Sequence, residues 1–123
     1  MGYYKMLKMI FKLPSVEYIG KMNEFLINKK CEDFRLNKLQ SVLSSFCYYS
    51  TKEEMISSIV LSIIKDHHFI DGNKRTALAM YLLLCRLNNI DHINKSDELV
   101  NVFVNIAENH YSVEECCSVL FKK

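Results

Sequence analysis

The sequence predicts an all-α fold, and three observations support this prediction. The 123 residues contain only 3 Gly and 1 Pro, so signals for β-hairpins are scarce. Apolar residues recur at i, i+3, i+4 and i+7 in several segments, which is the period of an amphipathic helix. Residues 51–54 and 112–115 both have the Ser/Thr-x-x-Glu pattern of a capping box. We therefore expect one domain over residues 1–123, built as a compact bundle of six helices.

The first two helices are predicted from their caps and apolar faces. Pro14 and Ser15 suit the first helical and cap positions of a helix that runs to about Ile27. Its expected apolar anchors are Val16, Ile19, Phe25 and Leu26. A second helix is expected after Asp33, with one apolar face formed by Leu36, Leu39, Leu43 and Phe46.

The third and fourth helices are expected to be central. The capping box at 51–54 begins a helix with a wide apolar stripe, made of Met55, Ile56, Ile59, Val60, Ile63 and Ile64. From about Lys74 to Asn88 the next helix is apolar nearly all round, through Ala77, Leu78, Met80, Leu82, Leu83, Leu84 and Leu87. Asn88 and Asn89 then supply a left-handed stop.

Two shorter helices complete the predicted bundle. Ser96 caps the fifth helix and places Asp97 and Glu98 in its first turn, where negative charge suits the helix dipole. The capping box at 112–115 begins the sixth, whose apolar face is Val113, Cys116, Cys117, Leu120 and Phe121.

The composition excludes several classes of protein. With 50% hydrophobic and 24% charged residues the chain is neither disordered nor collagen-like. Lysines interrupt the apolar N-terminus and the longest apolar stretch is 77–85, so we expect no signal peptide, no membrane span and a cytoplasmic location. The cysteines are odd in number and lack Cys-x-x-Cys spacing, which predicts thiols packed as small apolar residues: Cys31, Cys47, Cys85, Cys116 and Cys117.

Positive charge is concentrated near the N-terminus. Residues 1–30 contain six Lys and two Glu, although the net charge of the chain is only +2. These lysines lack the interleaved aromatic residues of a nucleic-acid platform, so a solvated helix face is the favoured interpretation and we expect no direct nucleic-acid binding.

The residues that could take part in catalysis or binding lie between the third and fourth helices, in the segment His67-His68-Phe69-Ile70-Asp71-Gly72-Asn73-Lys74-Arg75. Its end delivers Asn73 and two cations to a helix N-terminus, where free N–H groups and the dipole already favour phosphate. One carboxylate, Asp71, could hold Mg²⁺ together with phosphate oxygens and water. A histidine at such a site can take a proton from an incoming hydroxyl. Phe69 should point inward and anchor the loop.

Each residue also has a simpler explanation when taken alone. A histidine at a helix end is more often a C-terminal cap than a catalyst, Asp71-Gly72 is a turn signal, and Asn73 could be an N-cap. Lys74 and Arg75 oppose the dipole at a helix start, which a bound anion would explain.

Taken together, the nine residues resemble the signature of the Fic/Doc superfamily. The form His-x-Phe-x-Asp-x-Asn-Lys-Arg is similar to the Doc ("death on curing") toxins of toxin–antitoxin pairs, and the likeness extends from about residue 50 to the end. The resemblance implies a Fic/Doc-type bundle with the motif loop between two central helices. By their position, residues 28–50 would hold the flap that in this family grips the segment being modified, although neither they nor residues 1–12 resemble the family in sequence.

Roles follow from the resemblance residue by residue. It implies that His67 is the general base, that Asp71 coordinates Mg²⁺, and that Phe69 is structural. Gly72, Asn73, Lys74 and Arg75 would hold the nucleotide phosphates. His68 occupies a variable position and receives no role.

Two departures from the AMP-transferring pattern favour the Doc branch. Fic enzymes that transfer AMP usually have Gly where this chain has Lys74, and a second Arg where it has Leu78. The Doc branch transfers the terminal phosphate of ATP, or another nucleoside triphosphate, to a protein hydroxyl, and its known target is elongation factor Tu. The alternatives are an AMP transferase and a non-catalytic helical regulatory protein, and Mg²⁺-dependent nucleotide binding separates the latter from both enzymes.

The resemblance also bears on control. Fic-type enzymes are commonly restrained by a helix with the pattern Ser/Thr-x-x-x-Glu-Gly/Asn, and this chain has no match, since Met55 follows Glu54 and Val104 precedes Glu108 by four residues. We therefore expect a separate antitoxin that acts in trans.

Overall fold

All described elements of this computed structural model are helices, which confirms the predicted all-α class. The structure describes residues 11–28, 39–41, 43–44, 49–66, 72–92 and 96–121. Residues 39–41 and 43–44 are helical, and the longer helices are α2 (Val16–Ile27), α4 (Lys52–Lys65), α5 (Asn73–Leu87), α6 (Ser96–Glu108) and α7 (Val113–Leu120).

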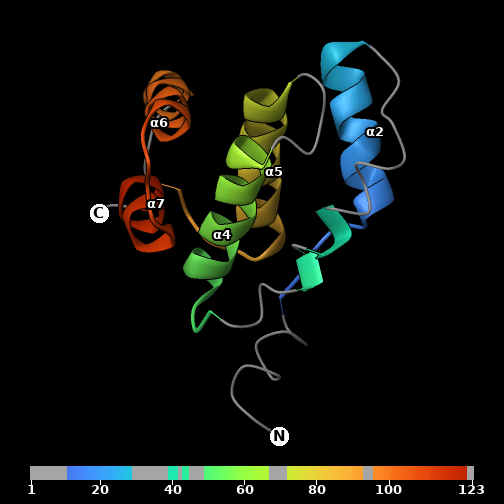
Figure 1. The fold of residues 1–123 in the computed structure, drawn as a ribbon. Helices are drawn as coiled ribbons and strands as arrows, with labels where there is room; N and C mark the ends of the chain where they lie inside the picture. Colours follow the sequence, from blue (N-terminus) through green and yellow to red (C-terminus); the bar gives the residue numbers. More distant parts are fainter. Residues whose placement is uncertain are drawn as a thin grey trace, which may run out of the picture.

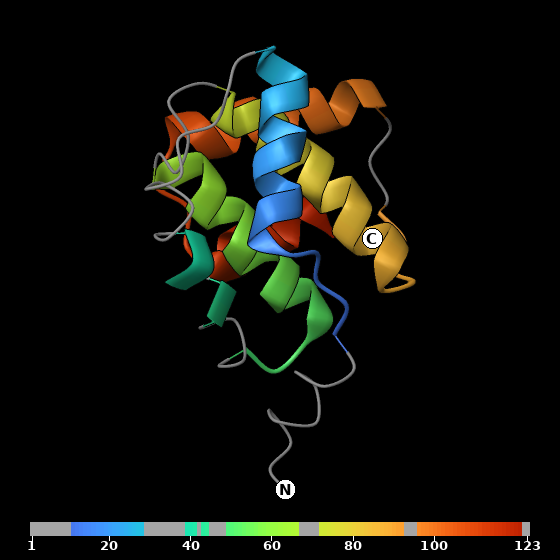
Figure 2. The same cartoon turned by 90° about the vertical axis from the view of Figure 1, so that its right-hand side faces the viewer.

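Helices α4 and α5 lie side by side in the middle of the bundle (Figure 1). Helix α2 packs against α5 on one side, and α6 and α7 cover the other side. Figure 2 shows the same bundle with α2 facing the viewer. The two helices that flank the motif are therefore the central ones, as the sequence predicts.

Most of the core comes from these two helices. On α4 the side chains of Met55, Ile56, Ile59, Val60 and Ile63 are fully buried, and on α5 those of Ala77, Met80, Tyr81 and Leu84. The Tyr81 hydroxyl donates to the carbonyl of Leu120 at 2.7 Å, which satisfies the polar end of this buried ring. The bond also fixes α7 against α5.

Helix α2 buries two of its expected anchors, Val16 and Ile19, but not Phe25. Its buried residues are Val16, Ile19, Gly20 and Asn23, whereas Phe25 is 86% exposed. The prediction that Phe25 is an apolar anchor of α2 is therefore wrong. At about 100° per residue it lies on the side opposite to the buried stripe, so packing of the stripe leaves it in solvent.

Helix α5 is apolar in composition but is buried on one side. Leu82 is 38% exposed, and it shares a face with two exposed arginines, Arg75 and Arg86. This face therefore stays exposed, because α2, α4 and α6 do not enclose it. The predicted left-handed stop is present, at Asn89 with φ 55°.

The predicted helix starts are found, with small differences. Ser112 and Glu115 form the complete capping box of α7. At α4 the Thr51 hydroxyl accepts from the Glu54 N–H at 3.1 Å, but the Glu54 carboxylate accepts from the hydroxyls of Ser50 and Thr51. Helix α6 begins at Ser96 itself rather than after it.

The second predicted helix can be checked only in part. Leu39 and Leu43 are buried as expected, while Asp33, Leu36 and Phe46 lie outside the described residues. Over the described ranges, no helix is both long and apolar enough to cross a membrane.

Candidate functional site

The predicted site lies where α4 ends and α5 begins, and the structure describes one half of it. His67, Phe69 and Asp71 lie outside the described residues, so their predicted roles as base, anchor and metal ligand stay predictions. Gly72, Asn73, Lys74 and Arg75 are described, and they form the start of α5. The phosphate-binding half of the prediction can therefore be examined in detail.

The segment before the motif is anchored to a distant helix. Near the end of α4, the Lys65 ammonium donates to the carbonyls of Ala107 and Asn109, at the C-terminal end of α6. A cation suits this position because helix C-termini carry partial negative charge and carbonyls without intrahelical partners. The bond fixes the last turn of α4, which directly precedes the motif in the sequence.

The segment after the motif begins at a glycine that the fold requires. Gly72 is the N-cap of α5 and has φ 75°, in the left-handed region that disfavours residues with a Cβ. A Cβ placed there would lie 2.3 Å from Ile27 Cγ2 and 3.3 Å from Asn23 Nδ2. Both neighbours belong to α2, so the start of α5 is packed directly against the last turns of that helix.

A buried hydrogen bond joins the same two elements. Asn23 Nδ2 donates to Oγ1 of Thr76 at 3.0 Å, and the two residues are 1% and 0% exposed. The backbone N–H of Thr76 donates to the carbonyl of Gly72 at 2.8 Å, which closes the first turn of α5. This turn is therefore fixed at Gly72 and again at Thr76.

Two cations project from that turn into solvent. Lys74 and Arg75 are exposed, and among the residues the structure describes neither forms an ion pair or hydrogen bond through its side chain. The first turn of α5 has no acidic residue, and Gly72 offers no side chain to cap its N–H groups. Positive charge at a helix N-terminus opposes the dipole, and an anion bound there would relieve that conflict.

The residues that the structure describes do not form a metal site by themselves. Over the described ranges there is no group of three or more His, Cys, Asp or Glu side chains that could hold a metal ion. Mg²⁺ bound to a nucleotide needs no such cluster, because phosphate oxygens and water provide most of its ligands. One carboxylate beside the first turn of α5 would fit that chemistry.

The described cysteines are poor candidates for nucleophiles. Burial raises the pKa of the Cys85 and Cys116 thiols to about 12, and it also raises the pKa of Cys117. Because the thiolate is the reactive form, these groups stay neutral and unreactive at physiological pH. Cys85 and Cys116 are buried free thiols in the core, as expected.

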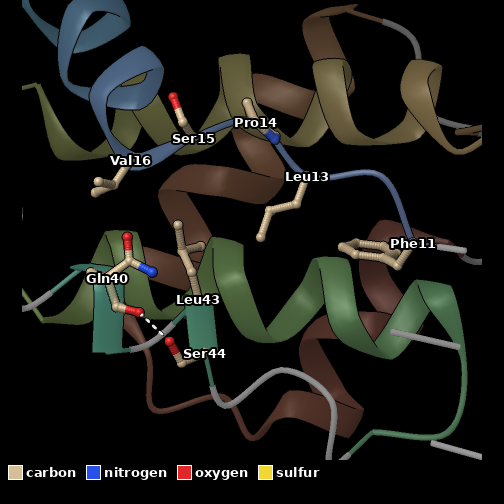
Figure 3. A pocket seen from close by; sticks show the side chains of 8 residues that line it. All are labelled: Phe11, Leu13, Pro14, Ser15, Val16, Gln40, Leu43 and Ser44. Carbon is tan, nitrogen blue, oxygen red and sulfur yellow. Dashed lines mark hydrogen bonds between the residues drawn. The ribbon is translucent and has the colours of Figure 1, made fainter. Parts of the chain in front are cut away.

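A hollow of about 370 Å³ lies at the other end of α2. Figure 3 shows its lining, which combines the segment before α2 and the first residue of α2 with the helical residues 39–41 and 43–44: Phe11, Leu13, Pro14, Ser15, Val16, Gln40, Leu43 and Ser44. Gly72 contacts Asn23 and Ile27, towards the C-terminal end of α2, whereas the hollow borders Ser15 and Val16 at its N-terminal end. The hollow is therefore not part of the candidate site.

Comparison with models of protein families shows to which family the chain belongs. The model of the Fic/DOC family matches residues 15–85, more than half of the chain and the whole of the segment from α2 to the core of α5. The chain belongs to the Fic/Doc family. This family generally transfers nucleotide-derived groups to proteins, and the match therefore indicates a Fic-type protein-modifying enzyme. No individual curated protein and no solved structure matches it significantly.

Three positions near the motif were not singled out from the sequence: Asn23, Lys65 and Thr76. Asn23 had a usable signal, because it follows Val16 and Ile19 at the spacing of one helix face and is the polar residue on that apolar stripe. Lys65 and Thr76 had none, since a lysine or threonine on a helix gives no indication of its tertiary partner.

Proposed function

We propose that this Fic/Doc protein is a Doc-like toxin that transfers the terminal phosphate of ATP, or another nucleoside triphosphate, to a Ser or Thr hydroxyl of a protein. Elongation factor Tu is the proposed target, by resemblance. The observation that best supports phosphate as the ligand is the start of α5, where Lys74 and Arg75 are exposed at a helix N-terminus capped by glycine.

In the proposed reaction the target hydroxyl oxygen forms a bond to the γ-phosphorus. The bond between this phosphorus and the β–γ bridging oxygen breaks, and the nucleoside diphosphate leaves. His67 accepts the hydroxyl proton as general base. Arg75 and Lys74 bind the phosphate oxygens and stabilise their charge, which is the main source of catalysis in phosphoryl transfer.

Asp71 is the proposed ligand of Mg²⁺. When bound, this ion neutralises charge on the triphosphate and fixes its geometry. The proposal is consistent with the first turn of α5, where the backbone is held by α2 and cations for the remaining phosphate charge are at hand.

Phosphate transfer is proposed over AMP transfer because of two positions on α5. Lys74 adds a cation to the phosphate-binding turn, and Leu78 is an apolar residue packed partly against the core. An AMP-transferring enzyme of this family usually has Gly and Arg there, so the charge is distributed differently. Moving one cation along the helix alters which phosphate is best stabilised beside the attacking hydroxyl.

A separate antitoxin is part of the proposal, because the sequence lacks the inhibitory helix pattern of the family. An active toxin without an internal inhibitor would damage its own host. We propose that a segment of the antitoxin folds onto the helical bundle when it binds.

The test is intact-mass analysis of bacterial lysate proteins, and of purified elongation factor Tu, after incubation with the chain and Mg-ATP. We expect one protein to gain the mass of a phosphate. The His67→Ala variant should transfer nothing, while His68→Ala, its matched control on the neighbouring residue, should stay active. A gain of the mass of AMP would show that the chain is an AMP transferase and not a kinase. Absence of both transfer and nucleotide binding would leave a non-catalytic helical protein.

A further inference from the structure

The first turn of α5, which follows the first half of the motif in the sequence, is held by residues that are far apart along the chain. Asn23 on α2 and Thr76 on α5 are separated by 53 positions, yet they form a buried hydrogen bond of 3.0 Å. Thr76 directly follows Arg75, and its N–H closes the turn onto the carbonyl of Gly72. The bond therefore acts on the same turn of helix that presents the two cations.

Asn23 also borders the other end of this turn. Its Nδ2 atom lies 3.3 Å from the position that a Cβ of residue 72 would occupy. One amide group thus contacts the first turn of α5 at its cap and four residues later. Apolar contacts are non-directional, whereas a hydrogen bond constrains direction as well as distance, so the amide can fix the rotation of α5 about its axis.

We infer that Asn23 is a positioning residue for phosphate binding. Through Thr76 it sets where the first turn of α5 presents its N–H groups, Lys74 and Arg75. Asn23 itself does not touch the phosphate. The inference rests on the proposed function for the identity of the ligand, but the placement of the turn can be measured without any ligand.

The chain offers matched variants for this test. Thr76→Val removes the acceptor and keeps the shape of the side chain, Thr76→Ser keeps the acceptor, and Asn23→Ala removes the donor. Tyr81→Phe is the control, because it also deletes a buried hydrogen bond of α5, the 2.7 Å bond to Leu120, at a place remote from the loop. All four variants should lose some stability, so stability alone does not distinguish them.

The first readout is the dissociation constant of Mg-ATP, measured by calorimetry. Asn23→Ala and Thr76→Val should each weaken binding by up to about tenfold, because a turn that is no longer held must be ordered when the nucleotide binds, at a cost of the order of the lost hydrogen bond. The double variant should bind no more weakly than Asn23→Ala alone, because that substitution already removes the interaction that Thr76→Val deletes. Thr76→Ser and Tyr81→Phe should bind like the unmodified chain.

The second readout is amide hydrogen exchange without nucleotide. In Asn23→Ala the exchange rate of the Thr76 amide, divided by that of the Leu84 amide further along α5, should rise about tenfold. The ratio cancels a uniform loss of stability, so in Tyr81→Phe it should stay constant. Asn23→Ser, a shorter polar side chain, takes the place of Asn23→Ala where the latter does not fold.

Three results would overturn the inference: an unchanged exchange ratio in the Asn23 variant, equal weakening of binding by Tyr81→Phe, or failure of Thr76→Ser to restore binding. A different result addresses the proposed function. If the unmodified chain binds no Mg-ATP and transfers no group, the proposed function is wrong. The exchange ratio then decides by itself whether Asn23 places the first turn of α5.

Discussion

Replacing Gly72 with alanine adds a methyl group where the structure has no room for one. The left-handed backbone at φ 75° would cost an L-residue about 1–2 kcal/mol. The new Cβ would also lie 2.3 Å from Ile27 Cγ2, and overpacking of this kind costs about 1–3 kcal/mol. The total, about 2–5 kcal/mol, is a large part of the stability of about 5–15 kcal/mol that is usual for a folded domain.

A second substitution separates the two causes. Ile27→Ala removes the atom that the new Cβ would meet, and alone it should cost about 1–2 kcal/mol because Ile27 is only partly buried. The Gly72→Ala/Ile27→Ala double variant should therefore be more stable than the sum of the single effects predicts, by about 1–3 kcal/mol. Gly72→Asn tests the backbone alone, since Asn tolerates the left-handed region better than Ala but retains the contact with Ile27.

The assay is unfolding by urea or guanidinium, followed by far-ultraviolet circular dichroism. A lower midpoint with an unchanged slope would report a loss of stability without a change in the surface exposed. If Gly72→Ala unfolded at the same midpoint as the unmodified chain, the close packing of α2 on the start of α5 would be wrong. Strict additivity of the two substitutions would contradict the role of Ile27.

Three further predictions concern binding and stability. Arg75→Ala should weaken nucleotide binding by loss of phosphate contacts, whereas Asp71→Ala should act through the metal, so raising Mg²⁺ in a binding assay should partly rescue only the second. The pKa of Cys85 and of Cys116 is raised from 9.0 to about 12 in the folded state, so their contribution to stability is complete below pH 9 and is lost as the pH rises towards 12. Thermal unfolding at high pH should show this loss of stability, and Cys→Ala variants at both sites should make the loss smaller. Asn88→Ala should destabilise the chain by about 1–3 kcal/mol in denaturant titrations, because the buried Asn88 amide bonds the backbone of the segment before α2 at 2.7 and 2.9 Å.

Local sequence signals were sufficient for most of the described helix ends. The capping box at Ser112, the N-cap at Thr51 and the stop at Asn89 depend on residues within one turn of each other, so a local pattern predicts them well. Phe25 shows where this fails. Its hydrophobicity suggested burial, but which face of α2 is covered depends on the partner helix, and α5 covers the opposite face.

The candidate site divides in the same way. Lys74 and Arg75 could be singled out because their charge opposes the helix dipole, which is a local conflict that the sequence displays. The hydrogen bond from Asn23 to Thr76 could not be predicted, since it joins positions 53 residues apart and depends on how α2 crosses α5. Chemical groups were thus foreseeable, whereas the contacts that orient them were not.

The bond from Lys65 to the end of α6 has a consequence for any attempt to transplant this motif. The segment that matches the family model ends at residue 85, before α6 begins. Yet α6 accepts the hydrogen bonds of Lys65, and α7 together with α6 covers α4. A fragment cut at the limits of the match would uncover the apolar side of α4 and release the last turn of α4, which directly precedes the motif in the sequence. The smallest fragment that would keep this site intact therefore includes α6 and α7, although neither helix contributes a residue to the motif.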